Sequence, residues 1–179
     1  MISTEEPTGR WNHAALGLHG SPDHEPHESV RARTWGNTRT KRNLVRTSHG
    51  YVQVFDDSVA YVEAALGLRE HDDPIDPCAA AWTEVTAHPR DEGSTDGTRW
   101  TDWELSPERS YVRRQAIPQT CRGTAAVIEY TVAASRIGVA GYATEALEDR
   151  LTYFANVIRR CGTPRDQAAL ERANELIQE

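Results

Sequence analysis

The sequence predicts an α+β fold, in which an antiparallel β-barrel or sandwich is followed by a helical tail. The first two thirds of the chain contain short runs of β-branched and aromatic residues, separated by polar loops, which is typical of antiparallel strands. The last third has apolar residues at helical spacing instead. At 179 residues, the chain is long enough to bury a core without disulfides. We expect one domain over residues 1–120 and a helical extension, packed on it, over residues 121–179.

The expected strands differ in the strength of their pattern. Val30–Trp35 alternates small or β-branched residues with arginines, which favours a half-exposed strand. Tyr51–Phe55 is entered through Gly50 and consists of β-branched and aromatic residues around one glutamine. Further strands are predicted at Ala81–Ala87, Thr98–Leu105 and Ser110–Ala116, with a polar connection over Pro89–Gly97. In the segment R-W-T-D-W, Trp100 and Trp103 are three residues apart, so on a strand one faces the core and the other the surface.

Helices are predicted from apolar spacing and from capping residues. A short helix over residues 57–66 follows Asp56-Asp57-Ser58 and ends at Gly67. The segment Ala125–Ile137 suits a strand or a helix, and its length and alanine content favour a helix. One face of a long helix carries Leu147, Leu151, Phe154 and Ile158, with Thr144 as its N-cap and Gly162 at its end. Thr163-Pro164 begins a last helix.

Composition excludes several classes of protein. The formal charge is −7, which argues against a general nucleic-acid-binding protein. The three cysteines Cys78, Cys121 and Cys161 have no C-x-x-C spacing, which argues against a disulfide framework and a zinc knuckle. The chain begins with no signal-peptide pattern and contains no run of eighteen apolar residues. We therefore expect a cytoplasmic protein without a membrane span.

One stretch of this acidic chain is basic. Between Val30 and Gly50 there is no Asp or Glu, and six basic residues occur: Arg31, Arg33, Arg39, Lys41, Arg42 and Arg46. Threonine hydroxyls and Asn43 accompany them, and this mixture of donors is what a phosphomonoester requires. Two interpretations stay open at this point. The segment binds an anion, or it is a basic surface segment paired with acidic neighbours.

Other candidate chemistry is sparse. His13, His19, His24 and His27 lie near the N-terminus, but Pro22 and Pro26 prevent a regular helix face there, so no dedicated metal site is expected. The hydrolase, metalloprotease and P-loop signatures are absent, and no catalytic residue can be named. Cys121 beside Arg122 is either a reactive thiol with a lowered pKa or a structural cysteine.

Four segments carry a resemblance to a known family. These are N-x-A-x-x-G-L (Asn12 to Leu18), T-R-T-x-R-N-L (Thr38 to Leu44), G-Y-V-Q-V-F-D-D (Gly50 to Asp57) and C-R-G followed by A-V-I-E-Y-T-V-A-A-S-R. In this order they resemble flavin-reductase-like FMN-binding split-barrel proteins, and within that group an uncharacterised, largely archaeal branch. The likeness extends over nearly the whole chain. The sequence departs from the branch at Cys121, where the family has asparagine, and at Thr124, where an aromatic is common.

The resemblance implies a Greek-key split barrel, a homodimer and an FMN near the subunit interface. Carried over by position, the isoalloxazine ring would lie beside four residues: Asn12, Ala14, Ala15 and Leu16. Ribityl and phosphate groups would be bound by Arg33, Thr34, Thr38, Thr40 and Asn43, with Arg122 approaching from a later loop. Two functions remain open: a flavin-dependent oxidoreductase, with a nicotinamide as one candidate electron donor, or a non-catalytic or accessory FMN-binding protein.

Overall fold

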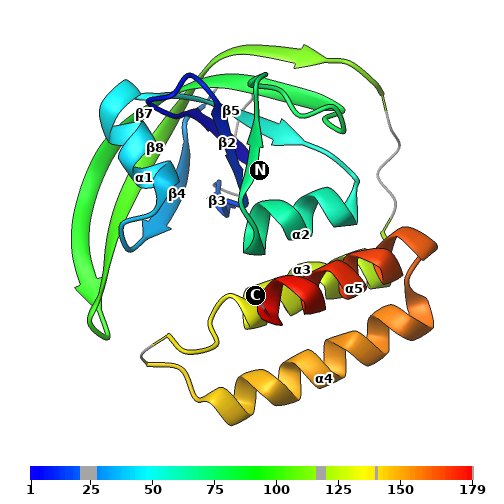
Figure 1. Ribbon diagram of the computed structural model, residues 1–179. Coiled ribbons are helices and arrows are strands. Elements are labelled where there is room, and N and C mark those ends of the chain that lie inside the picture. Colours follow the sequence, from blue (N-terminus) through cyan, green and yellow to red (C-terminus); the bar gives the residue numbers. More distant parts are fainter. Residues whose placement is uncertain (21–27, 116–119, 140, 179) are drawn as a thin grey trace. The chain divides into compact units, whose positions relative to one another are not determined.

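The computed structural model describes residues 1–20, 28–115, 120–139 and 141–178, which form two compact units. The first unit consists of Met1–Asp56 and Arg69–Gln115 and contains the strands (Figure 1). The second unit consists of Asp57–Leu68 and Ala116–Glu179 and is helical. Each unit is described separately below.

An antiparallel sheet forms the first unit, with strand order β3-β4-β8-β7-β5-β1-β2-β6. Its neighbouring strands are often far apart in sequence, as in β4 beside β8 and β5 beside β1. In Figure 1 the long β7 and β8 curve around the shorter strands. The strands are β1 (Ile2–Glu5), β2 (Trp11–Ala14), β3 (Leu18–His19), β4 (Val30–Trp35), β5 (His49–Val54), β6 (Arg69–His71), β7 (Ala81–Thr95) and β8 (Thr98–Val112).

The β7–β8 hairpin is longer than the sequence predicts. The predicted polar connection Pro89–Gly97 is wrong, because β7 continues to Thr95 and only Asp96 and Gly97 form the turn. Both turn residues have positive φ (49° and 80°), as in the two-residue turns that match strand twist. A register shift directly after Pro89 accommodates the proline, whose nitrogen has no hydrogen to donate. The predicted strands 98–105 and 110–116 are one continuous strand ending at Val112.

A helix that the sequence analysis did not predict, α1 (Arg39–Thr47), lies between β4 and β5. Thr38 caps it by accepting a hydrogen bond from the Lys41 N–H at 3.2 Å. Ser48, in the left-handed conformation with φ 52°, ends it. Leu44 is fully buried, and it belongs to the core of the first unit with Ile2, Ala32, Val85, Ala87, Trp103 and Leu105.

The second unit contains α2 (Ser58–Leu66), α3 (Arg122–Ala134), α4 (Thr144–Cys161) and α5 (Pro164–Gln178). The predicted helices are confirmed, including the segment that suited either a strand or a helix. Asp57 caps α2 by accepting from the Ala60 N–H at 2.9 Å. Thr144 is the first residue of α4, and Ala143 rather than Thr144 is its N-cap. The helices share a core of Val62, Ala126, Val127, Tyr130, Ala155, Val157, Ile158, Ala169, Leu170 and Ala173.

Asp166, on the first turn of α5, is a buried hydrogen-bonding centre of the second unit. Its carboxylate accepts from the Thr163 N–H at 2.8 Å and from the Thr124 hydroxyl at 3.0 Å. It also accepts from the hydroxyl of Ser58 on α2. Thr163 in turn accepts from the Asp166 N–H at 3.2 Å, a reciprocal capping arrangement. One carboxylate therefore joins α2, α3 and the start of α5.

The α+β class predicted from the sequence, with an antiparallel strand-rich part followed by helices, is confirmed. None of the described helices is both long and apolar enough to cross a membrane.

Candidate functional site

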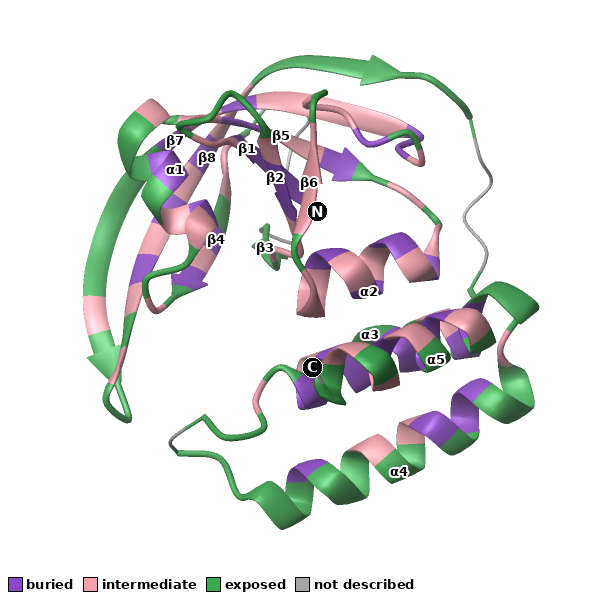
Figure 2. Cartoon of the chain, in the orientation of Figure 1, coloured by how far each residue is buried: buried purple, intermediate pink, exposed green. Residues whose placement is uncertain are grey.

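A buried polar cluster joins α1 to the sheet. Thr4 and Asn12 are opposite each other in the β1–β2 pair, and Thr40 and Asn43 are three residues apart on one face of α1. Asn12 Nδ2 donates to Thr40 Oγ1 at 3.2 Å, and Asn43 Nδ2 donates to Thr4 Oγ1 at 3.1 Å. All four residues are buried, whereas the opposite face of α1 is exposed (Figure 2). The structure thus brings together three predicted site residues and adds Thr4.

Thr4 was missed by the sequence analysis, although a signal for it exists. The predicted turn at Pro7-Thr8-Gly9 is confirmed, with the Glu6 N–H donating to the Arg10 carbonyl at 2.7 Å. A tight turn there pairs the residues on its two sides as an antiparallel hairpin. That pairing places Thr4 opposite Asn12.

The N-terminus of α1 has the properties of an anion-binding site. The first N–H groups of a helix have no partner within the helix, and the helix dipole favours negative charge beside them. The first turn of α1 contains no acidic residue and does contain Arg39, Lys41 and Arg42. Thr38, the capping residue, is exposed at this end. A phosphate group fits this donor set.

Two neighbouring predicted site residues on β4 face opposite sides of the sheet. Thr34 is 4% exposed and accepts a hydrogen bond from Trp103 Nε1 at 2.9 Å. Arg33, the preceding residue, is half-buried and points to the other face, as successive strand residues do. Their side chains therefore do not converge on one group from β4.

The guanidinium of Arg33 is already paired with a carboxylate. Its Nε and a terminal nitrogen donate to the two oxygens of Asp102 at 2.5 and 2.8 Å, and its guanidinium lies 4.0 Å from the Trp100 ring centre. The hydrogen bond with Asp102 raises the pKa of Arg33 and lowers the pKa of Asp102.

Trp103 is 1% exposed and belongs to the core, whereas Trp100 is half-buried. The predicted division of these two tryptophans between core and surface is confirmed.

The remaining basic side chains of this segment divide between two kinds of partner. Arg39 pairs with Glu70, and Lys41 lies 3.4 Å from Glu92. Hydrogen bonds from Thr101 and then Lys41 lower the pKa of Glu92. The exposed Arg42 and Arg46 donate to backbone carbonyls. Both interpretations of the basic segment therefore keep support: part of the charge is paired with acids, and part stays exposed around the start of α1.

The other predicted residues lie in different surroundings. Ala14, Ala15 and Leu16 are half-buried, and Leu16 packs against the core of the first unit. Arg122 is exposed at the first position of α3, in the second unit. Their predicted contacts with a flavin stay predictions. His24 and His27 lie outside the described residues.

Cys121 is the N-cap residue of α3. A hydrogen bond with the Thr124 side chain lowers the pKa of its thiol, and backbone N–H groups at the start of the helix act in the same direction. Its sulfur also lies 3.8 Å from an oxygen of Asp166. The two alternatives for this cysteine, reactive or structural, remain open.

Two family descriptions match nearly the whole chain. Residues 1–114 match the N-terminal domain of DUF447, a family described as proteins of unknown function. Residues 121–175 match the C-terminal domain of the same family. No curated protein matches the chain.

Solved structures resemble the chain at low sequence identity. A crystal structure of an FMN-bound DUF447 protein from Methanosarcina mazei is 19% identical, covers 98% of this chain and 92% of its own, and gives a TM-score of 0.79. The styrene monooxygenase flavin reductase from Pseudomonas putida S12 is 15% identical over 63% of this chain and 76% of its own, with a TM-score of 0.44. The first of these shares the fold over both units, and the predicted split-barrel family is confirmed.

Proposed function

Because the chain belongs to the DUF447 family, we propose that it binds FMN and acts as a flavin-dependent oxidoreductase of the flavin-reductase-like kind. The observation that supports this most is the FMN-bound relative from Methanosarcina mazei, which has the same fold over 98% of this chain. The second is the N-terminus of α1, whose donors suit the phosphate of that cofactor.

In this proposal the phosphate lies at the start of α1. The backbone N–H groups of Arg39 and Thr40 and the Thr38 hydroxyl supply hydrogen bonds, while the N–H groups of Lys41 and Arg42 are bound to Thr38. The exposed guanidinium of Arg42 supplies charge. The buried contacts of Thr40 with Asn12 and of Asn43 with Thr4 hold α1 against β1 and β2. Such fixed donors bind an anion with little loss of conformational freedom.

The four residues proposed to lie beside the ring, Asn12, Ala14, Ala15 and Leu16, belong to one short segment that is interrupted only by His13. Asn12 and Ala14 belong to β2, and the two residues after them continue the chain toward β3. Half-buried small and apolar side chains here suit the flat apolar face of an isoalloxazine ring. Arg33 and Thr34 remain members of the proposed site, although Arg33 is bound to Asp102.

Bound FMN supplies the redox chemistry, and the protein sets its orientation and surroundings. A homodimer, a cytoplasmic location and a nicotinamide electron donor are further parts of the proposal. The alternative function, a non-catalytic or accessory FMN-binding protein, differs from the proposed oxidoreductase only in that the bound flavin is not turned over.

FMN binding is tested by titrating the apoprotein with FMN and following flavin fluorescence. Arg42→Ala and Arg46→Ala each remove one exposed guanidinium from α1, at its first and last turns respectively. A phosphate at the helix N-terminus predicts that Arg42→Ala weakens binding about tenfold, the cost of one charge-assisted hydrogen bond, while Arg46→Ala leaves it near wild type. Equal effects of the two substitutions contradict the proposed position of the phosphate.

Turnover is tested on the FMN-loaded protein under anaerobic conditions with NADH and NADPH. Bleaching of the oxidised flavin absorption by either donor supports the oxidoreductase. Flavin that stays oxidised with both donors, in a protein that binds FMN tightly, supports the non-catalytic alternative.

A further inference from the structure

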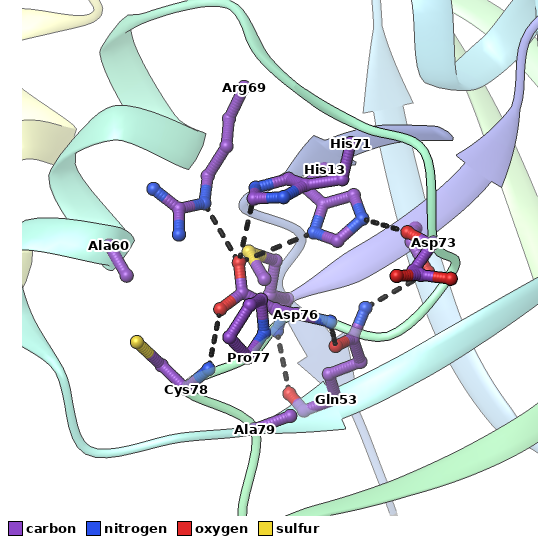
Figure 3. Close-up of polar contacts among 12 residues, drawn as sticks. His13, Gln53, Ala60, Arg69, His71, Asp73, Asp76, Pro77, Cys78 and Ala79 are labelled. Carbon is purple, nitrogen blue, oxygen red and sulfur yellow. Dashed lines mark hydrogen bonds and ion pairs between the residues drawn. The ribbon is translucent and has the colours of Figure 1, made fainter. Parts of the chain in front are cut away.

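Two histidines and one aspartate meet at the β2–β6 edge of the first unit (Figure 3). In the antiparallel pair of β2 and β6, His13 is opposite Arg69. Residues two apart on a strand share a face, so His71 lies on the same face as His13 and Arg69. The loop after β6 then brings Asp76 back to these three side chains.

The three candidate ligand atoms are close to the spacing of a metal site. Asp76 Oδ2 lies 3.5 Å from His13 Nδ1 and 3.7 Å from His71 Nε2, and the three atoms are all within 4.8 Å of one another. Ligands about 2.0–2.2 Å from a tetrahedral zinc ion are about 3.3–3.6 Å apart. Small side-chain adjustments therefore suffice for the three atoms to contact one ion.

His13 has a buried nitrogen that aims at this centre without a hydrogen bond. Its side chain is 0% exposed, and Nδ1 forms no hydrogen bond of ordinary geometry with the described part of the chain. Its other nitrogen, Nε2, lies 3.4 Å from the Asp73 carbonyl oxygen. A proton on Nε2 leaves a lone pair on Nδ1 directed toward the carboxylate. Histidines that bind metals are commonly oriented by such a contact of the opposite ring nitrogen.

Asp76 is held in place by hydrogen bonds with other parts of the protein. Its backbone N–H donates to Gln53 Oε1 at 2.8 Å, and its Oδ1 accepts from the Cys78 N–H at 2.8 Å. Its other oxygen, Oδ2, faces the imidazoles and accepts from Arg69 Nε at 2.8 Å. The side chain of Asp76 is 0% exposed, whereas that of His71 is 28% exposed. Solvent thus reaches the cluster at His71.

We propose that His13, His71 and Asp76 form a binding site for a divalent transition metal ion of the zinc type. Two imidazole nitrogens and one carboxylate oxygen suit Zn²⁺ and its neighbours better than Mg²⁺ or Ca²⁺, which prefer oxygen ligands. Three protein ligands leave a coordination position for water. The site differs from the sequence-based expectation that the chain has no metal site, and none of its three ligands is a proposed FMN-binding residue.

Arg69 competes with a metal ion in this site. Its guanidinium donates to the same oxygen, Oδ2, that faces the two imidazoles. Removing the guanidinium frees that oxygen and removes a positive charge beside the ion. The Arg69→Met variant therefore binds metal more tightly than the wild type, an effect that a purely structural ion pair would not produce.

The experiment is a titration of the untagged, metal-free full chain with Co²⁺, followed by its visible absorption and by competition with Zn²⁺. We expect saturation at one equivalent and at least tenfold weaker binding in His71→Ala, whose side chain is partly exposed. His88→Ala, which removes an exposed histidine of β7, retains the site, as does the double variant His24→Ala with His27→Ala. Circular dichroism checks that each variant is folded.

Four results overturn the proposal. The first is the absence of saturable Co²⁺ binding by the wild type. The second is equal affinity of the wild type and folded His71→Ala. The third is loss of binding in the His24 and His27 double variant. The fourth is unchanged or weaker binding in folded Arg69→Met, which would remove Asp76 Oδ2 from the ligand set.

Discussion

Gly123 lies so close to the backbone of Gly162 that it cannot carry a larger side chain without movement of the backbone. A Cβ atom on Gly123 would lie 2.3 Å from the Cα of Gly162. The start of α3 and the end of α4 meet at this point.

Gly123→Ala should therefore destabilise the helical unit. Overpacking of a closely packed contact costs about 1–3 kcal/mol, so we expect a lower midpoint in thermal unfolding followed by circular dichroism. Gly17→Ala is the matched control, since a Cβ there has no neighbour within 4 Å. Equal midpoints for the two variants would contradict this account of the contact.

Because of Asp166, the stability of the helical unit should depend on pH in the acidic range. Burial on its own raises the pKa of Asp166, but the hydrogen bonds from Ser58, Thr163 and Thr124 outweigh it and hold the pKa below its ordinary value. The ionised carboxylate then stabilises the fold fully above about pH 4, and this contribution is lost as the pH falls through the lower folded-state pKa.

Asp166→Asn is expected to lower the free energy of unfolding by about 2 kcal/mol at pH 7. The difference from wild type should shrink on acidification to about pH 3. Urea unfolding at both pH values measures it, with Asp149→Asn on the exposed face of α4 as the control. A difference that does not change with pH would show that the charge of Asp166 is not what stabilises this unit.

Thr34 and Thr95 permit a comparison of two equivalent hydrogen bonds, one buried and one exposed. Thr34 Oγ1 accepts from Trp103 Nε1 at 2.9 Å, and Thr95 Oγ1 accepts from Trp100 Nε1 at 3.2 Å. Thr34→Val leaves a buried indole N–H without an acceptor and should cost about 1–3 kcal/mol in urea unfolding of the apoprotein. Thr95→Val should cost close to nothing, because water replaces the lost acceptor. A similar cost for both would argue against burial as the cause.

Arg33 should contribute less to FMN affinity than Arg42. The guanidinium of Arg33 is bound by both oxygens of Asp102, so a phosphate would have to displace that carboxylate. We expect Arg33→Ala to weaken FMN binding by less than threefold, against about tenfold for Arg42→Ala. Fluorescence titration of both variants decides the order, and a larger effect of Arg33→Ala would make it a direct phosphate ligand.

The sequence alone predicted those elements whose signals are local. Asp57 and Gly67 delimit α2, and Pro164 begins α5, because capping depends on single residues at fixed positions. The strand β4 was predicted with its observed limits. The extension of β7 to Thr95 was not, since a polar hairpin arm lacks apolar alternation.

The candidate site was predictable only in part. α1 was missed because its sheet-facing side carries the polar Thr40 and Asn43 beside the single apolar Leu44, so apolar periodicity has little to detect. The family resemblance nevertheless selected Asn12, Thr40 and Asn43, which the structure brings into one cluster. Thr4 lies opposite Asn12 in a local hairpin, whereas the contact of Asp102 with Arg33 depends on the pairing of β4 with β8, which are far apart in sequence.

The membership of α2 in the helical unit affects how the chain can be divided. The polypeptide leaves the strand-rich unit after Asp56, returns at Arg69 and leaves again after Gln115, so three covalent connections join the two units. A fragment truncated before α3 keeps α2 but loses the helices that cover Val62, and a fragment beginning at α3 lacks α2 altogether. Neither half is therefore a self-sufficient expression fragment, and a single proteolytic cut would not release one unit from the other.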